Sequence, residues 1–226
     1  APFPGDRLYA VENGPSGFDP AAPVHRAKTA YLMLMRNGRL AALKTRLAED
    51  GRTFTLQRDG TPQLRADLGT AEGRAELEAY LTAYMGTEVR GPLRVLAAPA
   101  GFRFMDSARS GFISLLNLDG VRDLEARMGL MIDPLRFRMN LHMDGWPAGL
   151  ERELVGRTLQ VGAARLEILC PTERCAAVNV NPVSAERDVN VVKALVQAYA
   201  HCDMGVYARI VEGGPIRRGD GVVALM

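Results

Sequence analysis

Alternation of apolar and polar side chains predicts several β-strands in the first part of the chain. Residues 52–58 read Arg-Thr-Phe-Thr-Leu-Gln-Arg, so their apolar side chains point to one face of a strand. The turn dipeptides Asp50-Gly51 and Asp59-Gly60 flank this segment, which is typical of a strand within a hairpin. Further strands are predicted over residues 7–11 and 31–35. This region is therefore rich in β-structure.

The period of the apolar pattern changes from that of a strand to that of a helix at Thr70. Thr70 resembles a helix N-cap, and an acidic residue follows in the first turn. Leu77, Leu81 and Met85 keep helical spacing up to Gly86. We therefore predict a helix of about four turns, at 3.6 residues each.

The second part of the chain mixes strands with shorter helices. Residues 118–128 predict an N-capped helix that ends at Gly129. Residues 185–201 predict another helix with one apolar face. The side chains on that face are Val189, Val192, Leu195, Val196 and Tyr199. The chain returns to β-structure over residues 206–211 and 219–225.

Irregular alternation of helices and strands disfavours a doubly wound parallel sheet. We predict an α+β fold that is rich in β-structure, with a β-barrel core, peripheral helices and a smaller β-rich N-terminal region. The two parts are placed at residues 1–95 and 96–226.

Composition and charge favour a well-folded chain with a small ligand. Hydrophobic residues make up 47% and charged residues 24%, which is unlike a disordered chain. The 28 Lys and Arg residues form no basic block and the net charge is +2, so we expect no nucleic-acid partner. Apolar runs are shorter than the roughly 18 residues of a membrane span, so we expect no membrane partner. The abundant guanidinium groups suit a small anion.

Cys175 lies where an apolar strand meets a turn. Residues 166–169 alternate as a strand, Pro171 interrupts it, and residues 176–180 resume a β-prone run that ends at Asn181-Pro182. We therefore expect the thiol in a short break between two strands. Because thiolate is a soft donor that binds metals, Cys175 is the leading candidate for chemistry.

The cysteine count argues against a disulfide scaffold. Three cysteines are an odd number, and four residues separate Cys170 from Cys175 instead of the two in a zinc knuckle. A zinc site that also uses His201 and Cys202 is an alternative, although paired knuckles are lacking. A thiol that packs as a small hydrophobe is another. Reduced thiols lead us to expect a cytoplasmic protein.

Four motifs of the second part carry a family resemblance. They are Leu135-Arg-Phe-Arg-Met-Asn-Leu141, Leu154-Val-Gly-Arg-Thr-Leu-Gln-Val-Gly162, Arg174-Cys175 leading to Val180-Asn-Pro182, and a terminal motif that begins Gly205-Val-Tyr-Ala-Arg. Together they resemble the MOSC domain, the C-terminal module of molybdenum cofactor sulfurases, which also occurs in the amidoxime-reducing component and in bacterial MOSC proteins. Residues 5–11, with Lys28-Thr29, resemble the β-barrel region that precedes MOSC in many members. The implied core is a MOSC-type β-barrel.

The resemblance implies a pocket between the two regions that holds the molybdenum cofactor (molybdopterin) or its sulfur. The family cysteine that matches Cys175 ligates molybdenum, and the position that matches Arg7 approaches the pterin phosphate. The positions that match Arg138 and Asn140 hold the pterin and its phosphate, for which a guanidinium and an amide are chemically suited. Pyridoxal phosphate belongs to a desulfurase domain of the sulfurases, so it is not expected here.

Departures from the family pattern add further expectations. Family members begin with a strand that carries a Tyr-Pro-Val-Lys-like segment before the Gly-Asp-Arg turn, and we expect that strand to be missing here. Met139 stands where many members have proline, and the acidic residue near the metal matches Asp106 only after a register shift. A ferredoxin-type cysteine set does not follow Leu225, so a reduction needs an external electron donor.

Three function classes follow from the resemblance. The first, which we rank ahead, is an oxidoreductase that uses a molybdenum cofactor on Cys175 to reduce N-oxygenated small-molecule substrates with an external electron donor. The second is a sulfur carrier on which a cysteine desulfurase places a persulfide at Cys175. The third is a noncatalytic domain that binds the cofactor or a partner protein.

Overall fold

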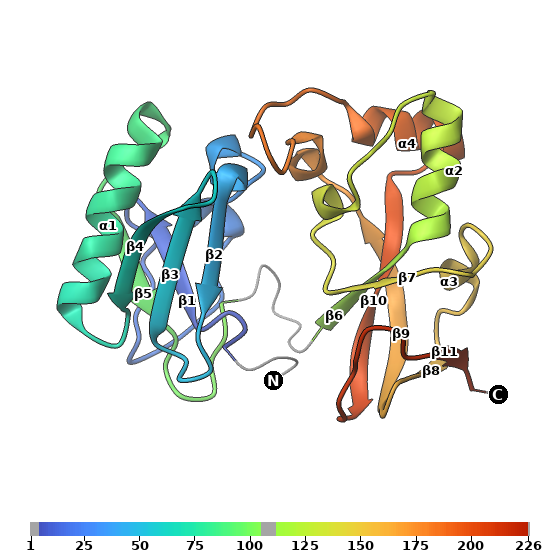
Figure 1. The fold of residues 1–226 in the computed structure, drawn as a ribbon. Coiled ribbons are helices and arrows are strands. Elements are labelled where there is room, and N and C mark those ends of the chain that lie inside the picture. Colours follow the sequence, from blue (N-terminus) through green and yellow to red (C-terminus); the bar gives the residue numbers. More distant parts are fainter. Residues whose placement is uncertain (1–4, 105–111, 226) are drawn as a thin grey trace. The chain divides into compact units, whose positions relative to one another are not determined.

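A computed structural model describes residues 5–104 and 112–225 of the chain. The chain forms two compact units, shown in Figure 1. The N-terminal unit contains residues 5–104, and the C-terminal unit is built from residues 112–182 and 187–225. The sequence analysis divided the chain into two parts between residues 95 and 96. In the structure, the strand Leu93–Ala97 of the N-terminal unit crosses this boundary.

The N-terminal unit combines two small sheets with one long helix. Its strands are β1 (Tyr9–Asn13), β2 (Leu43–Leu47), β3 (Thr53–Arg58), β4 (Thr61–Asp67) and β5 (Leu93–Ala97). Its helices are α1 (Ala71–Met85) and the short 3-10 helices η1 (Lys28–Ala30), η2 (Gly38–Ala42) and η3 (Gly86–Glu88). Strands β2, β3 and β4 form one antiparallel sheet in that order, and β1 pairs antiparallel with β5. The predicted hairpin strand is therefore the centre of a sheet.

Helix α1 forms where the sequence predicts it. The Thr70 hydroxyl accepts a hydrogen bond from the Gly73 amide at 3.0 Å and thus caps the first turn. Leu77, Leu81 and Met85 are buried, and the helix packs against β4 and β5. Figure 1 shows α1 beside β4. Leu77 and Leu81 pack with Leu56 of β3 in the apolar core of this unit.

Residues 31–35 do not form the predicted strand. Tyr31 makes only an isolated bridge with Glu12, directly after η1. The Asn37 side chain then accepts the Met33 amide at 3.0 Å, which closes a turn. This local hydrogen bond overrides the β-propensity of the apolar run.

The C-terminal unit is built on one six-stranded sheet. Its strands are β6 (Phe112–Asn117), β7 (Leu141–Met143), β8 (Thr158–Val161), β9 (Ala164–Glu173), β10 (Asp203–Glu212) and β11 (Val222–Ala224). Its helices are α2 (Leu118–Met128), α3 (Leu150–Glu153), α4 (Val191–Tyr199) and the 3-10 helices η4 (Pro134–Phe137) and η5 (Ala176–Asn179). The strand order is β11-β8-β9-β10-β6-β7, and only β6 and β7 pair in parallel among the described strands.

The sheet curls into a half-barrel, so the predicted α+β class with a β-rich core is confirmed. Helices α2 and α4 pack together and, with Phe137 and Leu116, bury an apolar cluster, and Figure 1 shows both helices at the same end of the unit. Helix α2 has its predicted bounds because the Asn117 side chain accepts the Asp119 amide and Gly129 ends the helix with a left-handed conformation. In the part of the chain that is described, no helix combines the length and apolarity that crossing a bilayer requires.

Two predictions around Cys175 are wrong. Strand β9 continues through Pro171, which lies opposite Val206 beside a register shift, where the ladder tolerates a residue without an amide donor. Ala176–Asn179 form η5 instead of a strand, and Val180 follows it with an extended backbone. Only Arg174 and Cys175 separate β9 from η5, so the thiol lies between a strand and a helix.

The helix predicted over residues 185–201 is shorter than expected. Helix α4 begins at Val191, because the Asn190 side chain accepts the Lys193 amide at 3.0 Å as its N-cap. Ala185 has a left-handed backbone, which does not continue into a helix. Val191 and Leu195 carry the buried face of α4.

Candidate functional site

Arg174 joins three segments of the C-terminal unit. Its guanidinium donates hydrogen bonds to the Phe137 carbonyl and, at 3.2 Å, to the Met139 sulfur. It also reaches the Met204 carbonyl at 3.5 Å, and the Arg174 amide donates to the Cys202 carbonyl at 2.9 Å. The loop after η4 is thereby fastened to the end of β9 and the start of β10.

This network brings two of the predicted residues into one neighbourhood. Arg138 directly follows Phe137, and Cys175 directly follows Arg174. The hydrogen bond between Arg174 and Phe137 therefore joins the chain neighbours of Cys175 and Arg138. Successive Cα atoms are only about 3.8 Å apart, so the two segments lie close together. Residues that are far apart in sequence are thus placed at one end of the sheet.

Arg138 presents a positive charge that no described residue pairs with. It ends η4 with a left-handed backbone (φ 53°), and its amide donates to the Leu135 carbonyl at 3.1 Å. Neighbouring protein atoms desolvate its guanidinium and lower the pKa of that group, although the residue is exposed to solvent. Within residues 5–104 and 112–225, no hydrogen bond or ion pair engages this side chain. The group is therefore suited to hold an anion.

Asn140 is oriented by strand β6. Its Oδ1 accepts the Ser114 amide at 3.0 Å and the Ser114 hydroxyl at 2.8 Å, and its own amide donates to the Ser114 carbonyl at 3.1 Å. A backbone amide can only donate, so the atom that faces Ser114 must be the oxygen. The Nδ2 group is then the part of Asn140 that can bind a ligand, as a hydrogen-bond donor.

Cys175 is a half-buried free cysteine at the N-terminal end of η5. Its carbonyl accepts the Val178 amide at 3.1 Å, and Arg187 donates to the neighbouring Ala176 carbonyl at 2.7 Å. Desolvation lowers the pKa of Arg174, and the ionisable groups of Tyr207 and Cys175 partly offset that effect. The thiol therefore lies in cationic surroundings.

Arg7 belongs to the N-terminal unit. It lies in a turn with a left-handed backbone, forms an ion pair with Asp6, and its carbonyl accepts the Phe104 amide at 3.0 Å. Its expected contact with a pterin phosphate stays a prediction. Asp106, the candidate for an acidic residue near the metal, lies outside the described residues.

The alternative zinc site is not supported. No group of three or more His, Cys, Asp or Glu side chains within the described ranges is arranged to hold a metal ion. Cys170, Cys202 and His201 therefore do not complete a zinc site with Cys175. A metal on the Cys175 thiolate would need further ligands from a cofactor.

Arg136 and Asp188 form a clamp that the sequence analysis did not single out. Arg136 is only 5% exposed and donates to both Asp188 carboxylate oxygens at 2.8 Å. Asn181 donates to the same carboxylate at 2.7 Å. Desolvation of Asp188 is outweighed by these hydrogen bonds, from Asn181 and then Arg136, which lower the pKa of its carboxyl group. The clamp holds the segment after Cys175 against η4. The sequence signal for it is weak, because it consists only of the alternating arginines in the motif that contains Arg136.

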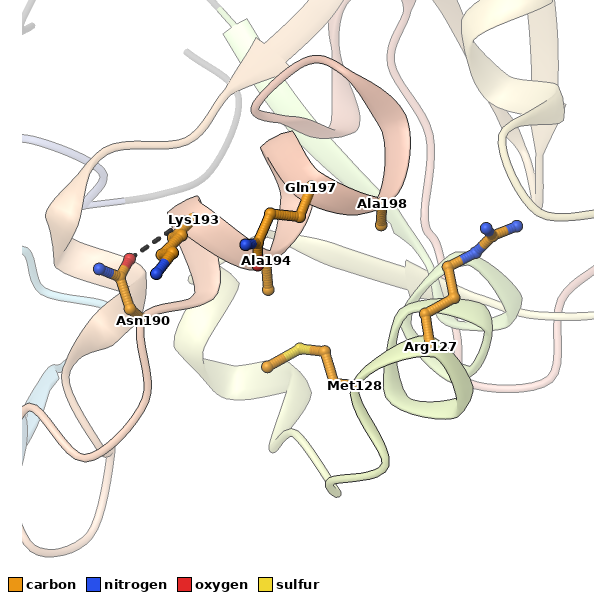
Figure 2. A pocket seen from close by; sticks show the side chains of 7 residues that line it. All are labelled: Arg127, Met128, Asn190, Lys193, Ala194, Gln197 and Ala198. Carbon is orange, nitrogen blue, oxygen red and sulfur yellow. Dashed lines mark hydrogen bonds between the residues drawn. The ribbon is translucent and has the colours of Figure 1, made fainter.

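The described cavities of this unit lie away from the candidate residues. One, of about 560 Å³, opens between α2 and α4, and Figure 2 shows Met128, Ala194 and Ala198 in it, surrounded by polar side chains. A second, of about 360 Å³, lies between α2, α3 and the start of β10. Neither is lined by Arg138, Asn140 or Cys175.

Comparison with known proteins identifies the class of this half-barrel. The family model described as the MOSC domain matches residues 108–223, so the chain belongs to the MOSC domain family. The crystal structure of YiiM from Geobacillus stearothermophilus is similar with 19% identity and a TM-score of 0.40, over 50% of this chain and 54% of that chain. The chain thus matches about half the length of that structure. No curated protein sequence matches it.

Replacing Arg174 with glutamine is expected to loosen the loop that carries Arg138. Loss of the charged hydrogen bonds should lower the free energy of unfolding by about 1.5 to 3 kcal/mol. The Asn140 amide, which donates to the Ser114 carbonyl, should exchange faster with deuterium. Urea unfolding and hydrogen exchange check both effects. Arg157→Gln is the control, because Arg157 is exposed and its side chain engages no described residue. Equal behaviour of the two variants would contradict the role of Arg174.

Proposed function

We propose that this MOSC protein binds the molybdenum cofactor through Cys175 and reduces N-oxygenated small molecules with an external electron donor. One observation carries the proposal: Arg174 donates to the Phe137 carbonyl, and their chain neighbours are Cys175, a free cysteine, and Arg138, whose guanidinium has no partner among the described residues. A phosphate and a soft metal ion are the ligands that suit these two groups.

The residues present fit such a cofactor. When bound, molybdenum cofactor supplies two-electron redox chemistry at its metal. Arg138 would hold the phosphate by charge-assisted hydrogen bonds, and the Asn140 Nδ2 group would donate to an acceptor of the pterin. The Cys175 thiolate would be the protein ligand of the metal. Arg174 keeps the loop and the thiol in place.

The same thiol also suits a sulfur carrier. The surroundings that favour this second function are cationic, with Arg174 next to Cys175 and Arg187 on the following carbonyl. In that reaction the Cys175 thiolate attacks the terminal sulfur of a cysteine desulfurase persulfide. One S–S bond forms, another breaks, and the desulfurase thiolate leaves. The new persulfide is an anion that neighbouring guanidinium groups stabilise. We expect a cytoplasmic location for either function.

Elemental and pterin analysis tests the proposal. Protein made in a host that synthesises molybdenum cofactor should contain both molybdenum and pterin, and should reduce an N-hydroxylated amidine with a chemical electron donor. Pterin-free protein from the same host would refute the cofactor assignment. In that case intact-mass analysis after incubation with a cysteine desulfurase distinguishes the remaining functions, because a carrier gains one sulfur atom on Cys175.

A further inference from the structure

The cavity of about 360 Å³ in the C-terminal unit is lined by charged side chains that the proposed function does not use. Its walls come from α2, α3 and the segment that leads into β10, whose positions are seen in Figure 1. Its charged and ionisable lining includes Asp123, Arg127, Glu151, Arg152, His201 and Asp203. The volume is within the range of roughly 300 to 1,000 Å³ that is typical of small-molecule sites.

Glu151 is a buried carboxylate in the lining of this cavity, and its charge indicates a cationic ligand. The residue is only 2% exposed. Its Oε2 accepts one hydrogen bond, from the Asn117 amide group at 3.0 Å. No cationic side chain within the described residues forms an ion pair with it. A buried carboxylate costs several kcal/mol unless a positive charge accompanies it.

The other two carboxylates of the cavity already have partners. Asp123 accepts the Tyr199 hydroxyl at 2.7 Å and the Arg127 Nε at 2.8 Å. Asp203 lies 3.5 Å from the Arg152 guanidinium. These two ion pairs account for both guanidinium groups in the lining.

His201 is engaged by other groups of the lining. Its Nδ1 accepts the Asp203 amide at 3.1 Å, and its Nε2 contacts the Arg152 guanidinium. The lining holds three carboxylates and two guanidinium groups, and both guanidinium groups pair with carboxylates other than Glu151. Glu151 is therefore the carboxylate to which an additional positive charge would bind.

We propose that this cavity binds a small organic ammonium ion whose charge pairs with the buried Glu151 carboxylate. A divalent metal fits less well, because hard cations need several oxygen ligands and the described residues contain no such group. The Tyr199 and His201 rings, stacked with centroids 5.7 Å apart, offer a flat wall to the organic part. The site contains neither Cys175 nor Arg138, so it is independent of the cofactor proposal.

Calorimetric titration with a matched pair of probes tests this site. Benzylammonium and benzyl alcohol have nearly the same size and differ in charge. Wild-type protein should bind benzylammonium saturably and benzyl alcohol at least tenfold more weakly. Glu151→Gln should weaken benzylammonium binding by about ten- to a hundredfold, because a charge-assisted contact is lost. Glu153→Gln, an exposed position on the same helix, should bind as the wild type does.

Each possible outcome decides the question. Equal affinity for the two probes, or the absence of saturable benzylammonium binding, would refute the site. Unchanged binding by a folded Glu151→Gln variant would do the same. Should near-ultraviolet circular dichroism show that this variant does not fold, the comparison of benzylammonium with benzyl alcohol on the wild type decides alone.

Discussion

Replacing Cys175 with alanine is expected to abolish molybdenum-dependent turnover and to leave part of the pterin bound. The substitution removes the protein ligand of the metal, whereas Arg138 and Asn140 keep their positions, because Arg174 and Ser114 hold them. Pterin and molybdenum content, measured beside the rate of reduction of an N-hydroxylated amidine, check this. A variant that keeps wild-type turnover would contradict the role of Cys175.

Arg138→Ala serves as the matched counterpart of that variant. It keeps the thiol but removes the uncompensated guanidinium, so the affinity for the whole cofactor should fall by about ten- to a hundredfold. The two variants should therefore differ more in pterin content than in activity. Arg157→Ala, at an exposed arginine of the same unit, should retain the cofactor. Equal pterin content in all three variants would show that Arg138 is not an anchor.

Gly205→Ala is expected to destabilise the C-terminal unit by about 2 to 5 kcal/mol. Gly205 has a φ of +77°, and a Cβ atom there would lie 2.4 Å from the Leu115 carbonyl oxygen and 2.6 Å from the Met139 Cε. The backbone contact cannot relax easily, and movement of Met139 would disturb its hydrogen bond with Arg174. Urea unfolding measures the loss.

Substitutions at two other glycines distinguish backbone strain from steric contact as the cause of this destabilisation. Gly219 has a φ of +91° but open space around a Cβ, so Gly219→Ala should cost only the backbone strain of about 1 to 2 kcal/mol. Gly213 has neither a positive φ nor a neighbour within 4 Å, so Gly213→Ala should be nearly neutral. A Gly205→Ala variant as stable as Gly213→Ala would show that the close approach is not needed.

Sequence patterns predicted those elements whose causes are local. Helix α1 follows from the Thr70 cap and the spacing of its leucines, helix α2 ends at Gly129, and strand β3 lies between two turn dipeptides. In each case the decisive hydrogen bonds and turns join residues close in sequence. The patterns failed where a local bond or a distant strand overrode propensity, as at Asn37 and Pro171.

For the candidate site, too, the sequence predicted the features that depend on single residues but not those that depend on tertiary contacts. Residue chemistry and the MOSC motifs were sufficient to select Cys175, Arg138 and Asn140, and the family model supports the domain that contains them. The buried charges could not be paired in advance, because Arg174 meets Phe137 and Arg136 meets Asp188 across long stretches of chain. Such pairings depend on which strands and loops become neighbours.

By itself, the sequence determined the α+β class, the MOSC family motifs and the residue types available for holding an anion and a soft metal. Only the tertiary structure decided that Arg174 joins the Arg138 loop to the segment of Cys175, and that the Asn140 side-chain oxygen accepts hydrogen bonds from Ser114. It also decided that Glu151 is buried with no ion-pair partner among the described residues. Propensity and capping act within a few residues, whereas the cost of a buried charge depends on the whole set of groups that folding packs around it.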